Sequence, residues 1–171
     1  MVVITATAMT ALPRDTWHMN DTPMPELSAA CATPRAETWG AIERFNRYDI
    51  RYLNGDVPQH WDGSGTDSLA RLWVRDDQPR ALDFASLTAM SDVFYPHAWL
   101  RRATRVAAGT VSMTIYFHAS KQQLVQTGIG YLLGQAQAQV FRHGFPDQTA
   151  QLWSESGMLL VTSHQLVYFK E

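Results

Sequence analysis

The sequence has one cysteine, few charged residues and no long hydrophobic run. Cys31 is the single cysteine among 171 residues, so neither an internal disulfide nor a cysteine-rich zinc site can form. No apolar run approaches the roughly 18 residues of a membrane-spanning helix. Residues 2–11 are apolar but have no basic region before them, so they do not match a signal peptide. These absences lead us to expect a cytoplasmic protein with no membrane partner.

Neither sign of charge is in excess. The 14 Lys and Arg residues nearly balance the 16 Asp and Glu residues, for a net charge of −2, whereas nucleic-acid binders usually carry a basic stripe. Charged residues make up 18% of the chain and hydrophobic residues 46%, which is typical of a globular protein. At this length the chain can bury about 70% of its unfolded surface without a metal or disulfide. We therefore expect a folded domain with no nucleic-acid partner.

Motifs for several common chemistries are missing as well. The six histidines form no i, i+4 pair and no HExxH pattern, so the sequence indicates no metal site. It also has no GxSxG, GxGxxG or P-loop pattern, so neither a nucleophile elbow nor a Gly-rich phosphate loop is expected. Arg101, Arg102 and Arg105 follow an apolar segment and could contact phosphates, although a solvated connection is the commoner role for such residues. The sequence implies no cofactor.

Six segments have the pattern of β-strands. The clearest is 110–118, where apolar residues alternate with polar ones from Val111 to Phe117, the period of two that defines a strand. The connections between most of these segments are short, which favours an antiparallel sheet. The predicted strands cover 45–53, 69–76, 106–118, 129–142, 148–154 and 158–169.

One segment has the period of a helix. Residues 81–95 carry apolar stripes that repeat at about 3.6 residues and are too wide for a helix lying in solvent. One stripe contains Leu82, Ala85, Ala89 and Val93. Asp76 or Asp77 could cap its start with Pro79 in the first turn, and Pro96 would stop it. The sequence thus predicts an α+β fold in which one antiparallel sheet wraps a single buried helix.

The N-terminal segment differs from the rest of the chain. Residues 2–11 are rich in Val, Ile and Thr, which favours a strand. Residues 12–38 hold four prolines and no persistent period, which indicates an extended linker. Trp17 and Met24 lead us to expect that this linker packs along the surface. We therefore divide the chain into a segment over 1–38 and a domain over 39–171.

Three polar residues stand out among apolar neighbours. Asp92 lies near the C-terminal end of the predicted helix, where the helix dipole disfavours a carboxylate. Gln165 shares a strand face with Val161 and Val167, and a buried amide without partners costs about 1–3 kcal/mol. Thr110 opens the 110–118 strand on its polar face. Each also has an ordinary interpretation: a tolerated exposed carboxylate, an amide that caps the sheet, and a β-branched strand residue.

Three motifs occur in an order that resembles a known family. They are AMSD at 89–92, TVSMTIYFH at 110–118 and LLVTSHQ at 159–165. Together they resemble the C-terminal repeat of the type II, double hot-dog acyl-CoA thioesterases. The sequences WVRDD at 73–77 and LLGQAQAQVFRHG…DQTAQLW at 132–153 are also similar to this family, particularly its actinobacterial-type members. The resemblance covers about residues 40–171.

The resemblance implies a hot-dog fold and hydrolysis of an acyl-CoA thioester, without a cofactor. It places the family's Asp–Thr–Gln catalytic trio on Asp92, Thr110 and Gln165. A carboxylate can accept a proton from water, and a hydroxyl and an amide can hold that water in line with a carbonyl. These residue types therefore suit the implied reaction.

The resemblance also implies that half of the family's architecture is missing here. Family members carry two hot-dog repeats, and this chain resembles the second. Residues 1–11 then correspond to the last strand of the first repeat, and 12–38 to the linker between repeats. We expect residues 1–11 to be peripheral and poorly packed in an isolated chain, and a homodimer to replace the two repeats.

Two other functions remain open at this point. A hot-dog dehydratase or hydratase would act on acyl thioesters through a histidine paired with an acid, and His97 or His118 would have to supply it. A non-catalytic half that binds acyl groups or dimerises is the other alternative. Convergence of Asp92, Thr110 and Gln165 would favour hydrolysis, whereas His118 facing Asp92 would favour hydration.

Overall fold

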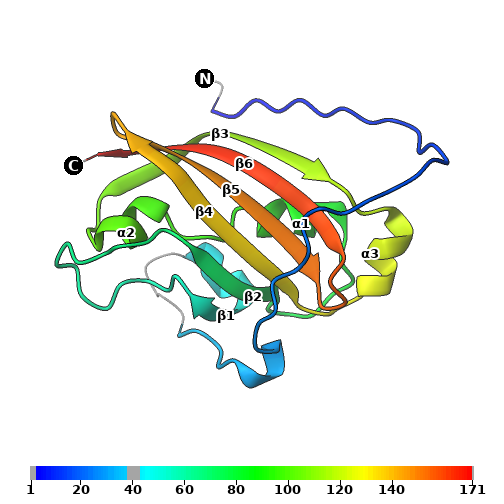
Figure 1. Cartoon of the computed structure of the whole chain (residues 1–171), viewed down its shortest axis with the longest axis horizontal. Helices are drawn as coiled ribbons and strands as arrows, with labels where there is room; N and C mark the ends of the chain where they lie inside the picture. Colours follow the sequence, from blue (N-terminus) through cyan, green and yellow to red (C-terminus); the bar gives the residue numbers. More distant parts are fainter. Residues whose placement is uncertain (1–2, 38–42, 171) are drawn as a thin grey trace.

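One antiparallel sheet of six strands forms the body of the molecule (Figure 1). The computed structural model describes residues 3–37 and 43–170, so the expected boundary at 38 and 39 lies outside the described residues. In sheet order the strands are β1 (Tyr48–Asn54), β2 (Ala70–Asp76), β4 (Leu132–Arg142), β5 (Phe145–Ser154), β6 (Leu159–Lys170) and β3 (Ala107–Phe117). Each observed strand matches a predicted one to within a few residues, and the predicted single antiparallel sheet is confirmed.

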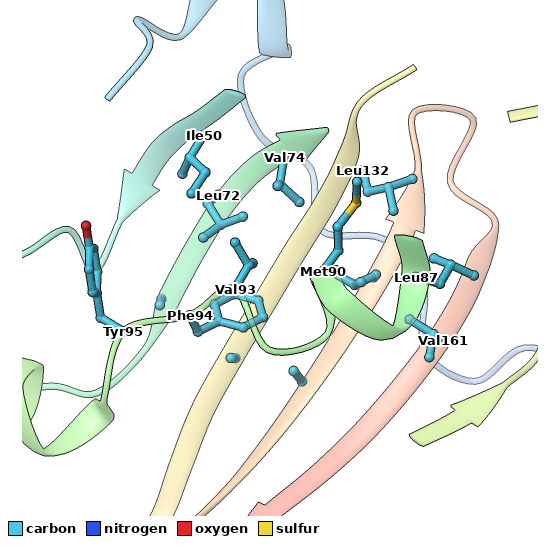
Figure 2. Packing of buried hydrophobic residues seen from close by; sticks show 14 of the residues in the cluster. Ile50, Leu72, Val74, Leu87, Met90, Val93, Phe94, Tyr95, Leu132 and Val161 are labelled. Carbon is cyan, nitrogen blue, oxygen red and sulfur yellow. The ribbon is translucent and has the colours of Figure 1, made fainter. Parts of the chain in front are cut away.

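The described residues form three short α-helices where the sequence predicted a single one: α1 (Phe84–Met90), α2 (His97–Arg102) and α3 (Lys121–Thr127). Two short 3-10 helices cover Ala30–Ala32 and Glu43–Arg47. Leu87 and Met90 of α1 are almost completely buried and lie among side chains from the strands (Figure 2). The capping box of Ser120 and Gln123 begins α3, which lies between predicted strands and was not itself predicted. No helix in the described part of the chain is long and apolar enough to cross a membrane.

The central helix is shorter than the predicted span of 81–95. It begins after Asp83, whose carboxylate accepts a hydrogen bond of 2.7 Å from the Ser86 amide; neither Asp76 nor Asp77 caps it. It ends at Met90, where the amides of Asp92 and Val93 donate to the carbonyls of Ala89 and Met90, three residues back, and tighten the last turn. Pro96 lies six residues beyond this end, so it does not stop the helix as predicted. The remaining residues form a turn and an extended segment, and a second helix, α2, follows.

Burial of the central helix is also narrower than predicted. Ala85 and Ala89 are exposed, while Ser86, Leu87 and Met90 are buried. The helix has about two turns and contacts the sheet along one side, so its other side faces outward. The rest of the predicted helix is buried as extended chain instead: Val93 and Phe94, after the helix, belong to the hydrophobic core.

The N-terminal segment forms no strand among its described residues 3–11. No sheet edge pairs with it, and Val3, Ile4 and Met9 are at least 78% exposed, which confirms the expectation that this segment is peripheral. In Figure 1 it runs along the top of the view, outside the strands of the sheet. The predicted packing of the linker begins only at about Thr22, whose carbonyl accepts a hydrogen bond from the Trp153 indole.

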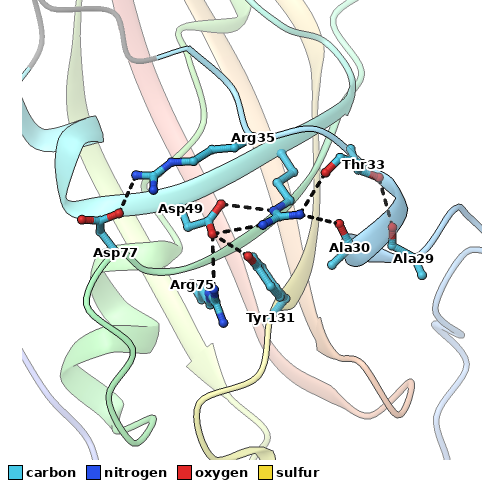
Figure 3. Close-up of polar contacts among 9 residues, drawn as sticks. Ala29, Ala30, Thr33, Arg35, Asp49, Arg75, Asp77 and Tyr131 are labelled. Carbon is cyan, nitrogen blue, oxygen red and sulfur yellow. Dashed lines mark hydrogen bonds and ion pairs between the residues drawn. The ribbon is translucent and has the colours of Figure 1, made fainter.

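Residues 22–36, which we call the clasp, cover part of the outer face of the sheet, around Trp73, Leu133 and Trp153. The Trp73 indole donates to the Ser28 carbonyl at 2.8 Å, and Arg51 donates to the carbonyls of Ala30 and Thr33 (Figure 3).

Asp49 lies beneath the clasp and binds Arg51, Arg75 and Tyr131 (Figure 3). Burial acts to raise the pKa of Asp49, but the hydrogen bonds from Arg51 and Tyr131 outweigh it and hold that pKa below its usual value. Arg51, which attaches the clasp, is therefore itself held in place by the Asp49 carboxylate.

Candidate active site

The three residues singled out in the sequence meet at one place. Gln165 on β6 donates through Nε2 to Asp92 Oδ1 at 2.9 Å and to Thr110 Oγ1 at 2.6 Å. The three come from different elements: the turn after α1, the edge strand β3 and the adjacent strand β6. Thr110 is the register partner of Val167, two residues from Gln165, so sheet pairing itself brings the hydroxyl and the amide together.

The position of Asp92 depends on how the extended segment after α1 seats on the sheet. Phe94 lies against Gly134 of β4, where an added Cβ would come within 2.9 Å of the Phe94 ring. A glycine at this strand position therefore leaves room for the ring. Because Val93 and Phe94, which follow it directly, are buried in the core, Asp92 is held at the rim of the core, partly exposed.

The Gln165 amide is fully used by its neighbours. It is 4% exposed, which confirms the expectation that a glutamine in this stripe must find partners. A carboxylate at Asp92 can only accept, so Gln165 must present Nε2 to it and Oε1 to the opposite side. There Gln148 of β5 donates its own Nε2 to Gln165 Oε1. Gln148 therefore supplies the donor that matches this orientation of the Gln165 amide and supports it.

Gln148 was missed in the sequence, although a signal was present. Within β5 it shares the inner face with Ala150 and Leu152, so it is a polar residue in an apolar stripe, as Gln165 is. Its Oε1 is buried and has no hydrogen-bond partner among the described residues. A buried unpaired acceptor costs about 1–3 kcal/mol, and the site carries this cost while Gln148 orients Gln165.

Arg44 completes the surroundings of Asp92. Its Nη1 lies 2.9 Å from Asp92 Oδ2, and both side chains are more than a third exposed. Ion pairs at such exposure contribute little stability, so a ligand could displace the arginine at small cost. No sequence pattern pointed to Arg44, because its approach to Asp92 spans 48 residues.

The side chains of the trio line a pocket of about 250 Å³. Its walls include Trp99 of α2, Tyr95 and the start of β3 at Ala108 and Gly109. Burial raises the pKa of Tyr95, the largest cause of its shift, so the phenol stays protonated near neutral pH. The pocket thus combines aromatic walls with one carboxylate, one hydroxyl and two amides.

Neither histidine considered for a hydratase faces Asp92. His118 binds Thr162 Oγ1 at 3.0 Å, and it lies eight residues beyond Thr110 along the chain, roughly 27 Å at strand spacing. His97 is completely buried, and its Nδ1 lies 2.6 Å from the Ser68 carbonyl. Burial lowers the pKa of His97 to about 4, so it is neutral near pH 7. The geometry favours the Asp–Thr–Gln arrangement over a histidine–acid pair.

Solved structures with this architecture have the hot-dog fold. A hot-dog protein of unknown function from Alicyclobacillus acidocaldarius is 34% identical, with a TM-score of 0.85; the match covers 93% of this chain and 59% of that one. The acyl-CoA thioesterase II TesB2 from Mycobacterium marinum is 15% identical, with a TM-score of 0.69 and coverage of 93% and 59%. The tesB protein of Mycobacterium avium subspecies paratuberculosis is 18% identical, with a TM-score of 0.64 and coverage of 90% and 56%. The comparison with curated proteins gives no match.

Residues 11–169 match the family model of the acyl-CoA thioesterase C-terminal domain. The chain belongs to this family, and the resemblance to the C-terminal hot-dog repeat of type II thioesterases is confirmed. The chain spans 59% of the length of the Alicyclobacillus and M. marinum structures.

Proposed function

We propose that the protein hydrolyses acyl-CoA thioesters to the free acid and coenzyme A, with Asp92, Thr110 and Gln165 as its catalytic residues. One observation carries the proposal: the Gln165 amide joins the Asp92 carboxylate and the Thr110 hydroxyl within a single pocket. Membership of the acyl-CoA thioesterase C-terminal domain family supports the substrate class.

Asp92 acts as the general base in this proposal. Its Oδ1 is held by Gln165 and its Oδ2 faces Arg44, which leaves further lone pairs for a water molecule. The carboxylate takes a proton from this water as the water oxygen attacks the thioester carbonyl carbon. The carbon–sulfur bond then breaks, and the proton on Asp92 passes to the departing thiolate.

Thr110 acts as a donor. Because its Oγ1 accepts from Gln165 Nε2, its own O–H is directed elsewhere and is available to the water or to the carbonyl oxygen. A donor at the carbonyl oxygen stabilises the charge that develops there. Both hydrogens of Gln165 Nε2 are used within the trio, so Gln165 orders the other two side chains.

A second copy of the chain is proposed to complete the enzyme. β3 is an edge strand with largely exposed residues, among them Val111, Tyr116 and Phe117 at 54%, 59% and 42%. An unpaired edge with apolar side chains is prone to association. Thr110 lies on this strand, so a copy docked along β3 would border the pocket.

Asp92→Asn tests the proposed chemistry because it keeps the shape of the side chain and removes the base. Release of free thiol from short, medium and long acyl-CoAs should fall about 10²- to 10⁴-fold, with unchanged thermal stability. Asp77→Asn is the matched control, since Asp77 is also an arginine-paired carboxylate with 37% exposure but lies outside the pocket. Unchanged hydrolysis in Asp92→Asn would favour the non-catalytic, acyl-binding alternative.

A further inference from the structure

Arg44 is the one cation among the described residues that line the active-site pocket. It lies in the 3-10 helix Glu43–Arg47, and its Cζ is 4.9 Å from the centroid of the Phe45 ring. Phe45 is buried and packs on Tyr95 of the pocket wall, with 4.6 Å between the two ring centroids. The guanidinium therefore has a fixed aromatic surface beside it.

The contact with Asp92 uses little of the hydrogen-bonding capacity of Arg44. Nη1 is 2.9 Å from Asp92 Oδ2, and Arg44 makes no other hydrogen bond or ion pair among the described residues. A guanidinium has more N–H donors than this contact needs. The ion pair is also half-exposed and therefore weak. A second anion in the pocket can compete for the arginine.

The rest of the pocket lining carries no charge. Apart from Arg44 and Asp92, its described residues are aromatic, aliphatic or neutral polar. An acyl group that ends in a methyl group would leave the ion pair unchanged. An acyl group with its own carboxylate would instead find a cation that can bind it. Without Arg44, the same carboxylate would face Asp92 with no positive charge between them, and like charges repel. Arg44 thus determines whether a second negative charge can enter the pocket.

We propose that the substrate is the coenzyme A thioester of a short dicarboxylic acid, whose free carboxylate binds Arg44. This inference rests on the proposed function and adds the class of acyl group. Arginine suits the task because its planar guanidinium donates two parallel hydrogen bonds to a carboxylate. Arg44 contacts the proposed base directly, so roughly two or three methylene groups between the two carboxyl carbons would span the site at hydrogen-bond and attack distances of about 3 Å.

Binding of such an acyl group would also prepare the proposed base. In the free protein Asp92 has Gln165 on Oδ1 and Arg44 on Oδ2. When the acyl carboxylate takes over the guanidinium, Oδ2 is released and can accept the proton of the attacking water. The acyl carboxylate is remote from the bond that breaks, so its binding energy is used at the reacting group.

The test compares glutaryl-CoA with pentanoyl-CoA, which have the same number of acyl carbons and differ in the terminal carboxylate. The native protein should hydrolyse glutaryl-CoA with the higher kcat/KM. Arg44→Met should lower the ratio of the two kcat/KM values about 10- to 100-fold. The ratio is measured because loss of the Asp92 contact affects both substrates. Arg47→Met is the matched control: Arg47 lies on the same helix, pairs with Glu43 at 3.2 Å and lies outside the pocket, so the ratio should not change.

The same two acyl groups on N-acetylcysteamine, which has no phosphate, show which anion Arg44 binds. A ratio that falls in Arg44→Met with both carriers supports the inference. Equal losses for the two coenzyme A thioesters alone would assign Arg44 to a phosphate and overturn it. Equal losses for all four thioesters, or a native preference for the pentanoyl group, would overturn it as well, while hydrolysis stands.

If the native protein hydrolyses none of these thioesters, the proposed function fails and binding decides the inference. Calorimetric titration should then give a Kd for glutaryl-CoA about tenfold below that for pentanoyl-CoA, and Arg44→Met should remove the difference. Equal affinities, or no binding of either thioester, would overturn the inference.

Discussion

Gln148 shows at the residue scale how one amide can control a reacting group that it does not touch. Its Nε2 donates to Gln165 Oε1. Gln165 in turn donates to Asp92 and Thr110. Without this donor, Gln165 Oε1 would be buried with no partner, and the amide would be held in place from the Asp92 and Thr110 side only. Gln148 is therefore a positioning residue in our proposal.

Replacing Gln148 by methionine keeps the length of the side chain and removes its donor. We expect kcat to fall about 10- to 100-fold with little change in KM, because the trio is misplaced rather than the substrate unbound. Combined with Gln165→Met, the loss should be no greater than for Gln165→Met alone.

Gln151→Met is the matched control for this pair. Gln151 lies on the same strand, but its register partners place it on the opposite face from Gln148. Activity of this variant should match the native protein. Multiplicative losses in the Gln148/Gln165 double variant would mean that Gln148 does not act through Gln165.

His97 gives the protein a pH dependence of stability. Its folded-state pKa of about 4 lies below the usual 6.5, so between these values the unfolded chain binds the proton and the folded protein does not. The free energy of unfolding should therefore fall as the pH drops from about 6.5 toward 4, by about 3 kcal/mol in total. Urea denaturation at pH 7 and pH 4.5 measures it, and His97→Phe should flatten this part of the profile. An unchanged slope in the variant would assign the loss to other groups.

At the scale of elements, the clasp explains how a proline-rich segment without strand or long helix stays attached to the sheet. Its contacts are indole and guanidinium hydrogen bonds to its backbone carbonyls, from Trp73, Trp153 and Arg51. Carbonyls on an extended chain have no partners of their own, so donors projecting from the outer face of the sheet satisfy them. The clasp in turn covers apolar residues that would otherwise be exposed, including Leu133.

Arg51→Met should loosen the clasp. It removes two hydrogen bonds to the clasp and one partner of the buried Asp49, so we expect about 3 kcal/mol of destabilisation. Trypsin should also cut more quickly after Arg35. Arg71→Met is the control, because Arg71 donates to Gln135 on the neighbouring strand instead. Equal effects of the two substitutions would mean that the clasp does not depend on Arg51.

At the scale of the whole molecule, the sheet has two edge strands, β1 and β3. β3 is the longer of the two, and Thr110 on it lines the active-site pocket. Pairing along β3 would continue the sheet into a second copy and would cover part of its apolar surface. This is the physical basis for the proposed dimer.

Light scattering should therefore report a dimer, and Tyr116→Lys should shift it toward the monomer with a parallel loss of hydrolysis. A lysine on an edge strand opposes pairing with another edge. Val140→Lys is the control, since Val140 is similarly exposed at 53% but lies on an interior strand. A strictly monomeric protein with full acyl-CoA hydrolase activity would contradict the proposal.

Much of the architecture was predictable because strand patterns are local. The alternation from Val111 to Phe117 depends on how consecutive side chains project from an extended backbone, and it located β3 closely. The helix was less predictable. Val93 of the predicted apolar stripe is buried, but Ala85 and Ala89 are exposed. Only the structure shows that the helix begins after the Asp83 cap and that extended chain replaces it beyond Met90.

For the candidate site, too, some features were predictable from the sequence and others were not. The sequence by itself determined the trio's candidates, because Asp92, Thr110 and Gln165 each occur in a family motif. Only the tertiary structure decided what joins them, since the amide of Gln165 reaches Asp92 across 73 residues and Thr110 across 55. The role proposed for Gln148 likewise depends on strand order and register. The face on which a side chain lies follows from the local backbone, whereas its contacts with residues distant in the sequence follow from the order and register of all the strands.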